Sequence, residues 1–372
     1  MYKELSIRTA RRLRAGAEDI PQLAATVGLD AFVDEIVRVV DKRTSDVEFT
    51  RIEQISELGA RIVNAAGRST NLELVVERVK LGGNGPIMAN ALAALGPAVT
   101  CIGPLGHPEV HPAFEEIAGR ATVVSLGQPA HTDALEFADG KLMMGKLEPL
   151  NDVNWDRIEE RMGAADIQRL FIEPSLVALV NWTMIPAMSA IWEKIAELLA
   201  AASGADGLYF FDLADPEKHP EETIAAACRL LARFNSYRTT LFGLNEKESI
   251  LVAHAFGYEG GHTTREDIGA IAVYISKALP VSSVVVHPRA YAVAASGGTL
   301  TADVDGPFTD NPLISTGAGD HFNAGFCLAK LLHLDDEEAA TAAVATSGYY
   351  VRHAASPSLQ DLAGFLEEQG AD

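Results

Sequence analysis

The residues best suited to chemistry lie in a glycine-rich run, residues 315–325, which reads Ser-Thr-Gly-Ala-Gly-Asp-His-Phe-Asn-Ala-Gly. Small residues followed by a helical pattern are typical of a turn that opens a helix. The backbone amides of Gly317, Ala318 and Gly319 would then point toward one spot, where the helix dipole adds partial positive charge. Such a turn can hold an anion and stabilise charge that develops on a transferred phosphoryl group.

Asp320 is the unusual member of this run, because a carboxylate beside an anion site is electrostatically unfavourable unless it has a task. Accepting a proton from a hydroxyl group that attacks phosphorus is a suitable task. Plain helix capping by an aspartate among glycines is the competing interpretation, and the run by itself leaves both open.

A second glycine-rich turn, Gly82-Gly83-Asn84, leads into a predicted helix that ends at Gly96 and Pro97. The glycines allow a ligand to approach the backbone closely. The Asn84 side chain offers both a donor and an acceptor, which suits the hydroxyl of a polyol. Taken alone, however, this segment is better explained as a tight strand-to-helix turn.

The elements that must position these turns alternate between strand and helix in the second half of the chain. This alternation predicts an α/β fold with a central, mostly parallel sheet flanked by helices, in which ligands bind at the carboxyl ends of the strands. We expect buried strands at 26–29, 99–103, 170–172, 208–213, 240–244 and 283–287, and helices at 84–95, 184–201, 221–233, 265–279, 318–332 and 337–350. An Asp139-Gly140 pair predicts a hairpin between two further strands.

Composition excludes several classes of protein. The chain has 372 residues, and its 30 basic and 51 acidic residues give a formal charge of −21, which disfavours nucleic-acid and anionic-membrane partners. The charge does not exclude a small anion held by backbone amides. Three cysteines fit neither a metal site nor a disulfide framework, and the uncharged stretch 174–192 is interrupted by Asn181 and Pro186. We expect a cytoplasmic protein.

Together, in this order, the two glycine-rich segments resemble the signatures of the PfkB/ribokinase family of carbohydrate kinases. Residues 82–96 are similar to its N-terminal signature and residues 316–325 to its C-terminal signature. Residues 354–358 resemble the closing stretch that this family places beside the nucleotide base. The resemblance covers roughly residues 26–368. It implies a ribokinase-like core with a small β-sheet lid that covers the sugar and excludes water.

The resemblance also implies roles for individual residues. Asp320 would be the general base, residues 317–319 the anion hole, and Thr316 a neighbour of the nucleotide. Asn245 and Glu248 match the N-x-x-E motif of the family, which orders Mg²⁺ and phosphate largely through water. Without the resemblance, the same pair would be interpreted as a helix N-cap and first turn.

ATP and Mg²⁺ are therefore the implied cofactors. Potassium activation is not implied, because Ile314 and Ser315 stand where the family often has an Asp-Thr pair.

For the acceptor, the family places an aspartate after the first strand, on hydroxyl groups of the substrate. Asp30 and Asp34 are both candidates, and Asp30 is favoured because it follows the predicted strand directly. Gly82, Gly83 and Asn84 would line the same sugar-binding region.

The implied domain organisation is an N-terminal extension at residues 1–25 and a kinase core at 26–372, with lid strands from about 35–50, 72–81 and 132–147. The extension is basic and helix-prone, so its arginines form either a docking arm or a solvated helix face. Lids in this family often pair, so a homodimer through the lid is a further expectation.

The sequence thus predicts transfer of the γ-phosphate of ATP to a hydroxyl of a sugar or sugar-like compound. Two alternatives with the same fold are a nucleoside kinase and a catalytically silent sugar-binding regulator. The regulator would be expected to lack Asp320 or the anion hole, and neither is missing. A dinucleotide-binding oxidoreductase would need a glycine-rich turn after the first strand, which Gly28 alone does not provide.

Overall fold

Uninterrupted runs of apolar residues form the strands of a large sheet, as expected for strands that are covered on both faces. The computed structural model describes residues 2–202 and 206–371. The strands of the large sheet are β1 (Ala24–Gly28), β5 (Ala98–Gly103), β6 (Thr122–Ser125), β9 (Leu176–Val180), β10 (Leu208–Asp212), β11 (Thr239–Asn245), β12 (Ser283–His287), β13 (Tyr291–Ser296) and β14 (Thr299–Asp305). Their order is β14-β13-β12-β11-β10-β9-β1-β5-β6, antiparallel from β12 to β14 and parallel elsewhere.

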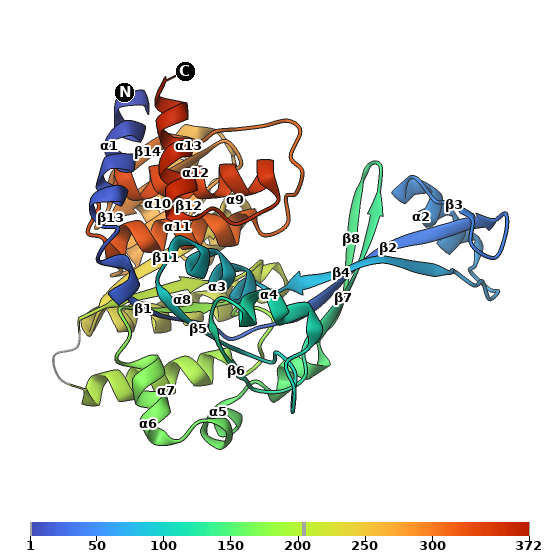
Figure 1. Ribbon diagram of the computed structural model, residues 1–372, viewed down its shortest axis with the longest axis horizontal. Coiled ribbons are helices and arrows are strands. Elements are labelled where there is room, and N and C mark those ends of the chain that lie inside the picture. Colours follow the sequence, from blue (N-terminus) through green and yellow to red (C-terminus); the bar gives the residue numbers. More distant parts are fainter. Residues whose placement is uncertain (1, 203–205, 372) are drawn as a thin grey trace.

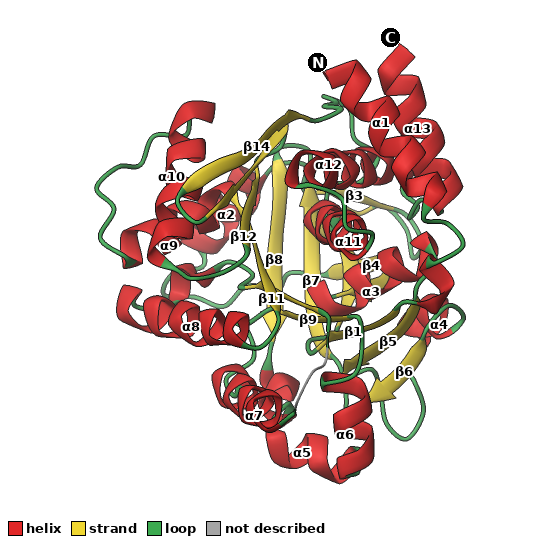
Figure 2. Cartoon of the chain, turned by 90° about the vertical axis from the view of Figure 1, so that its left-hand side faces the viewer, coloured by secondary structure: helices red, strands yellow, loops and turns green. Residues whose placement is uncertain are grey.

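Helices cover both faces of this sheet because alternate residues of the buried strands point to opposite sides. One apolar core contains residues of α5 (Trp155–Arg161), α6 (Ala164–Phe171), α7 (Met188–Ala201), α8 (Glu221–Arg233), α9 (Glu246–Ala255) and α10 (Arg265–Ala278). The other contains residues of α1 (Tyr2–Ala15), α3 (Asn84–Leu95), α4 (Glu115–Ala118), α11 (Ala318–Leu331), α12 (Asp336–His353) and α13 (Leu359–Ala371). Figure 2 shows α7 and α8 on one side of the strands and α3, α11 and α12 on the other. Within the described parts of the chain, every helix is too short or too polar to cross a membrane.

A smaller sheet projects from the core, and we call it the lid after its predicted role (Figure 1). Its strands are β2 (Phe32–Arg43), β3 (Phe49–Arg51), β4 (Leu74–Gly82), β7 (Ala130–Phe137) and β8 (Gly140–Lys146). The long β2 pairs with β4 on one edge, with β7 on the other and with β3 near its far end. The predicted hairpin at Asp139-Gly140 is confirmed as the β7–β8 turn. The strands of this sheet fall mostly within 35–50, 72–81 and 132–147, and its role as a lid stays a prediction.

A short helix, α2 (Ile55–Asn64), packs on the lid through a small apolar core of its own. Leu58 of α2 lies in this core with Val37 and Val39 of β2 and Leu135 of β7. The same chain therefore covers part of one face of the lid. Pairing of two copies through the lid stays a prediction.

One local prediction is wrong, and one pair of strands was missed. The expected strand at 170–172 belongs to the end of α6, and the strand is β9, which follows it. Leu170 and Phe171 are buried in the core, and a short buried apolar run does not distinguish a helix from a strand. The antiparallel pair β13 and β14, joined by Gly297 and Gly298, was not predicted.

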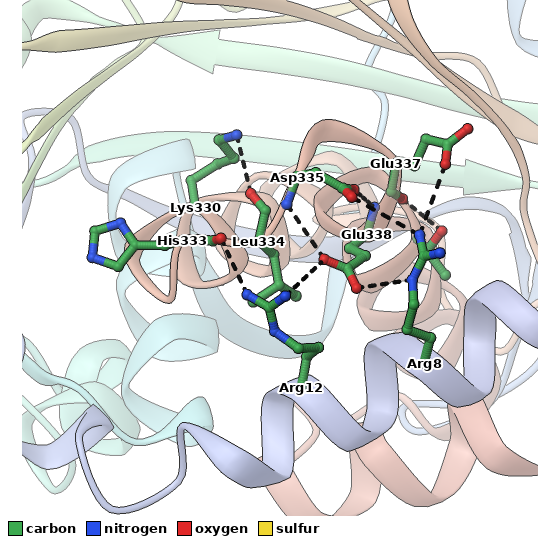
Figure 3. Close-up of polar contacts among 9 residues, drawn as sticks. Arg8, Arg12, Lys330, His333, Leu334, Asp335, Glu337 and Glu338 are labelled. Atoms are coloured by element: carbon green, nitrogen blue, oxygen red, sulfur yellow. Dashed lines mark hydrogen bonds and ion pairs between the residues drawn. The ribbon is translucent and has the colours of Figure 1, made fainter.

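The N-terminal helix α1 is packed against the core rather than standing apart from it. Leu5 and Leu13 are buried, and α1 contacts α12 and α13. Figure 3 shows Arg8 and Arg12 reaching from α1 to the carboxylate of Glu338, whose side chain is only 3% exposed. The Arg8 Nε–Glu338 Oε1 distance is 3.0 Å. These arginines therefore anchor the helix to α12, which argues against a docking arm.

Candidate functional site

The two glycine-rich turns meet at the carboxyl edge of the large sheet. The first opens α3 at Asn84 and the second opens α11 at Ala318. The Asn84 amide Nδ2 donates a hydrogen bond to Asp320 Oδ1 at 2.9 Å, across 236 residues of sequence. The fold therefore brings together the two motifs that the sequence predicted to act together.

Asp320 is nearly buried, with 7% of its surface exposed. Burial raises the pKa of its carboxyl group well above the usual value, and the charge of Asp212 raises it further. The hydrogen bond from Asn84 opposes this shift, because it stabilises the ionised carboxylate. An aspartate with a raised pKa is a stronger base than a solvated one, as a proton acceptor requires.

The predicted anion hole lies at the start of α11. Gly317 has φ +91°, and a Cβ there would lie 3.0 Å from Ile87 Cγ2, so both the turn and the packing need glycine. The first helical hydrogen bond of α11 joins the His321 N–H to the Gly317 carbonyl. The amides of Gly319 and Asp320 therefore lie in the first turn, ahead of this bond, whereas the Ala318 N–H donates to the Ser315 carbonyl at 3.3 Å.

Asn245 and Glu248 form a capping box at the start of α9, which confirms the simpler interpretation of their sequence. The Glu248 N–H donates to Asn245 Oδ1 at 2.9 Å. The Glu248 carboxylate accepts from the N–H groups of Asn245 and Asp215 at 2.8 and 2.9 Å. Capping holds this carboxylate in a fixed, buried position, which does not prevent it from facing a bound cation.

Asp212, at the end of β10, belongs to the same buried group of acids. It accepts hydrogen bonds from the Ala214 N–H and from Asn323 Nδ2, both at 2.8 Å. Burial raises the pKa of Asp212 to about 6, and burial with the charge of Asp212 raises the pKa of Glu248 to about 8. The signal in the sequence for a ligand contact by Asp212 is its position at the carboxyl end of a buried strand.

These acids fit a hard divalent cation. Asp212, Glu248 and Asp320 supply only oxygen donors. The charge of Asp212 raises the pKa of both other acids, and the charge of Glu248 raises that of Asp320. A divalent cation would relieve that repulsion. The hydrogen bonds that Asp212 and Glu248 already accept favour contact through water over direct coordination.

We expect thermal stability to depend on pH and Mg²⁺ together. Because the folded-state pKa values of Asp212 and Glu248 are raised, their stabilising contribution is complete below about pH 4 and is lost as the pH rises toward 8. In EDTA, the melting temperature should therefore fall by a few degrees between about pH 5 and 8. Mg²⁺ should reduce the fall, because it binds the ionised carboxylates.

The matched comparison is Glu248→Gln, which removes the charge and keeps an acceptor for one of the two backbone N–H groups. Its melting temperature, measured over the same pH series, should vary less and respond less to Mg²⁺. If the melting temperature of Glu248→Gln falls with pH as steeply as that of wild type, the pKa of Glu248 is not raised.

Asp30 and Asp34, the two candidates for the acceptor side, have different surroundings. Asp30 is fully buried and accepts from the N–H groups of Asn84 and Gly85 at 2.9 and 2.7 Å and from Asn181 Nδ2 at 2.7 Å. Its carboxylate thereby caps the first residues of α3 from the neighbouring turn. This arrangement explains Asp30 as a structural group.

Asp34 lies on β2, where the lid joins the core. Its strand neighbours are Lys80 of β4 and Thr132 of β7. Burial raises the pKa of Asp34, and the charge of Lys80 and a hydrogen bond from Thr132 oppose the rise. A Cβ on Gly82 would lie 2.4 Å from Asp34 Cγ, so glycine makes room for this carboxylate beside the turn.

A cavity of about 410 Å³ opens beside the start of α11. Its walls include Gly319, Asn245 and, from the 306–312 loop, Phe308. The His287 ring also faces it, and its Nε2 atom has no hydrogen-bond partner among the described residues. Burial lowers the pKa of His287 to about 4, so the ring is neutral. The cavity offers apolar walls with a few polar groups, as nucleotide sites do.

The structure also places His321, the predicted nucleotide stretch 354–358 and Thr316. His321, which follows Asp320, stacks on Tyr350 at 3.6 Å and bonds to Ser356 Oγ at 2.9 Å, so it is structural. Residues 354–358 do not line the cavity beside α11. The Thr316 hydroxyl accepts a hydrogen bond at 3.2 Å from Lys141 of the lid, and the Thr316 carbonyl accepts one from Tyr350.

Comparison with known proteins agrees with this geometry. A family model described as prokaryotic ketohexokinase matches residues 6–369. A ketohexokinase from Haloferax volcanii is 28% identical over 97% of this chain and 96% of its own length.

Among solved structures, ribokinase from Arabidopsis thaliana superposes with a TM-score of 0.63 at 16% identity, over 93% of this chain and 98% of the ribokinase. Adenosine kinase from Sinorhizobium meliloti has a TM-score of 0.61 at 15% identity, with 93% and 98% covered. These two likenesses confirm the ribokinase-like fold. Given the match over nearly its full length, the chain belongs to the prokaryotic ketohexokinase family, one of the PfkB/ribokinase carbohydrate kinases, and is a phosphotransferase that acts on a sugar hydroxyl.

Proposed function

We propose that this protein transfers the γ-phosphoryl group of ATP to a hydroxyl group of a ketohexose. The family description and the name of the Haloferax volcanii relative support the acceptor class. The observation that carries the chemistry is the position of Asp320, in the first turn of α11 and bonded to Asn84 at 2.9 Å. A base, an anion-binding helix terminus and a polyol-binding turn meet there.

In the proposed reaction, Asp320 accepts the proton of the sugar hydroxyl as its oxygen attacks the γ-phosphorus in line. A new oxygen–phosphorus bond forms, the bond to the bridging oxygen of the β-phosphate breaks, and ADP leaves. The amides of Gly319 and Asp320 stabilise the charge on the transferred group. Asn84 keeps the Asp320 carboxylate oriented toward the hydroxyl group.

Asn245, Glu248 and Asp212 are the residues that would hold Mg²⁺, mainly through water. When bound, the cation neutralises charge on the β- and γ-phosphates. The fixed capping geometry of Glu248 supports this assignment, since both of its oxygens are oriented by backbone N–H groups.

The acceptor would lie between Asp34, the Gly82-Gly83-Asn84 turn and the lid. We assign the contact with the sugar hydroxyls to Asp34 rather than Asp30, because Asp30 is committed to three hydrogen bonds within the protein. Asp34 has Gly82 directly beside it and the lid residues Lys80 and Thr132 across its strand.

The nucleotide would occupy the cavity beside α11, with its phosphates toward Gly319 and its base toward Phe308. The unpartnered Nε2 of His287 would give this site one further polar contact.

A screen of phosphoryl acceptors tests the proposal. Purified protein with ATP and Mg²⁺ is incubated separately with ketohexoses, aldohexoses, pentoses, sugar phosphates and nucleosides, and ADP release is measured. We expect ketohexoses to give the highest kcat/KM and omission of Mg²⁺ to abolish turnover. A higher kcat/KM for a nucleoside would support the nucleoside-kinase alternative. If none of the acceptors in the panel causes ADP release, the proposal is contradicted.

A further inference from the structure

The lid presents positive charge on the face that carries Asp34. Alternate residues of a strand share a face, so the strand pairing places Lys80 and Arg78 of β4 on the same side as Asp34. The pairing of β7 with β8 places Lys141 on that side as well, opposite Glu136. Arg38 of β2 shares this face, so basic side chains outnumber Asp34 and Glu136 there, although the net charge of the chain is −21.

Lys141 reaches from this face to the turn that opens α11. Its Nζ atom lies 3.2 Å from Thr316 Oγ1, next to Gly317. It also lies 3.7 Å from Glu136 Oε1. A lysine ammonium group has three donors and can exchange such neighbours for a phosphate oxygen without losing its charge.

The core supplies negative charge close to the turn that Lys141 reaches. Asp320 is flanked by Asp30, Asp212 and Glu248, and all three raise its pKa. The triphosphate of ATP would add more negative charge to this acidic site. A cation brought by the lid would offset both.

Two hydrogen bonds from residues 53–55 of the lid hold the tip of the β7–β8 hairpin, which carries Lys141. The Ala138 N–H donates to the Glu53 carbonyl at 2.7 Å. The Ile55 N–H donates to Asp139 Oδ1 at 3.0 Å, so Asp139 caps the start of α2, whose own N-cap residue makes no such bond. The residues around 53–55 and α2 therefore position the tip that carries Lys141.

We propose that Lys141 is a catalytic residue whose ammonium group contacts the transferred phosphoryl group when the lid covers the site. This inference rests on the proposed kinase function and adds a residue to it. Lys141 takes no proton and forms no bond. It stabilises negative charge on the phosphoryl oxygens as the group passes from ADP to the sugar, and it makes productive closure of the lid depend on that group.

The test compares Lys141→Met with Lys146→Met. Lys146 lies on the same strand but on the opposite face, where it pairs with Asp133 at 2.9 Å. We expect Lys141→Met to lower kcat by about 10²–10³-fold, the usual loss for one donor to developing charge, with KM for the ketohexose changed by less than about threefold. Lys146→Met should match wild type, and Lys141→Arg should restore at least a tenth of kcat.

A binding measurement separates catalysis from simple closure of the lid. The complex of ADP, Mg²⁺, aluminium fluoride and ketohexose mimics the transferred phosphoryl group. Its affinity should fall in Lys141→Met, whereas the affinity for ADP alone should not. If kcat at saturation is preserved in Lys141→Met and only the KM for the sugar rises, Lys141 serves only to hold the lid closed. Its assignment as a catalytic residue is then overturned.

The two proposals can fail separately. If wild type phosphorylates a ketohexose and Lys141→Met is equally active, only the role of Lys141 is wrong. If wild type phosphorylates no sugar, the proposed function itself fails.

Discussion

Asp320→Asn is expected to lower kcat by about 10²–10⁴-fold while leaving the fold and nucleotide binding intact. Asparagine is nearly isosteric and can still accept the hydrogen bond from Asn84, but it cannot take up a proton from the sugar. Since the substitution also removes a buried charge flanked by Asp212, the melting temperature should stay equal or rise. Steady-state kinetics, calorimetric titration with ATP and Mg²⁺, and thermal melts measure the three effects.

Asp361→Asn is the matched control, because Asp361 occupies the same third position in the first turn of α13 but neither lines the cavity beside α11 nor shifts the pKa of Asp320. It should retain the kcat of wild type. A near-normal kcat in Asp320→Asn would mean that another group accepts the proton, and the proposed role of Asp320 would have to be abandoned.

The second large effect concerns the two aspartates that follow β1, of which one is expected to be needed for stability and the other for sugar binding. Asp30→Ala should destabilise the protein by about 3–5 kcal/mol, because the amides of Asn84, Gly85 and Asn181 would be left buried without their acceptor. Asp34→Ala should leave the melting temperature nearly unchanged and lower kcat/KM for the ketohexose about 10²-fold or more. Thermal melts and kinetics on both variants decide the assignment.

Gly82→Ala provides an independent check on Asp34. The new Cβ would lie 2.4 Å from Asp34 Cγ and would displace that carboxylate without removing it. The variant should therefore share the kinetic defect of Asp34→Ala and bind ATP normally. Suppose that Asp34→Ala retains the wild-type kcat/KM while an Asp30 variant that still folds loses kcat/KM for the ketohexose. Asp30 would then contact the sugar, and Asp34 would be the structural residue.

Local sequence signals predicted the elements that carry the two motifs. The helix at 84–95 is α3 with the same bounds, because glycines and a proline mark both of its ends. The helix at 221–233 and the strand at 283–287 also coincide with α8 and β12. In each case the information lies within about 15 residues of sequence, so no distant contact is needed to read it.

The choice between Asp30 and Asp34 could not be made in this way. Their difference depends on partners far along the chain: Asn181 is 151 residues from Asp30, and Thr132 lies on β7 opposite Asp34. Both residues look alike in sequence, as carboxylates near the end of a buried strand. Strand register and side-chain direction, which only the folded chain defines, separate them.

The contact between Lys141 and Thr316 could not be predicted from the sequence either, because its partners are far apart in the chain. It joins residues 175 apart in the chain, and neither the Asp139-Gly140 hairpin nor the 315–325 run indicates the other. The charge relation between Asp212, Glu248 and Asp320 likewise arises from three strand and helix ends that meet at one edge of the sheet. Sequence spacing placed each acid at an edge but did not place them together.

The packing of α1 also constrains how the chain folds during its synthesis. Arg8 and Glu338 are 330 residues apart, so at ordinary elongation rates roughly 15–65 s pass between the translation of the two. Throughout that interval the apolar face of α1, with Leu5 and Leu13, has none of its partners in α12 and α13. The apolar face of α1 can therefore be buried against α12 and α13 only after these last two helices have been synthesised.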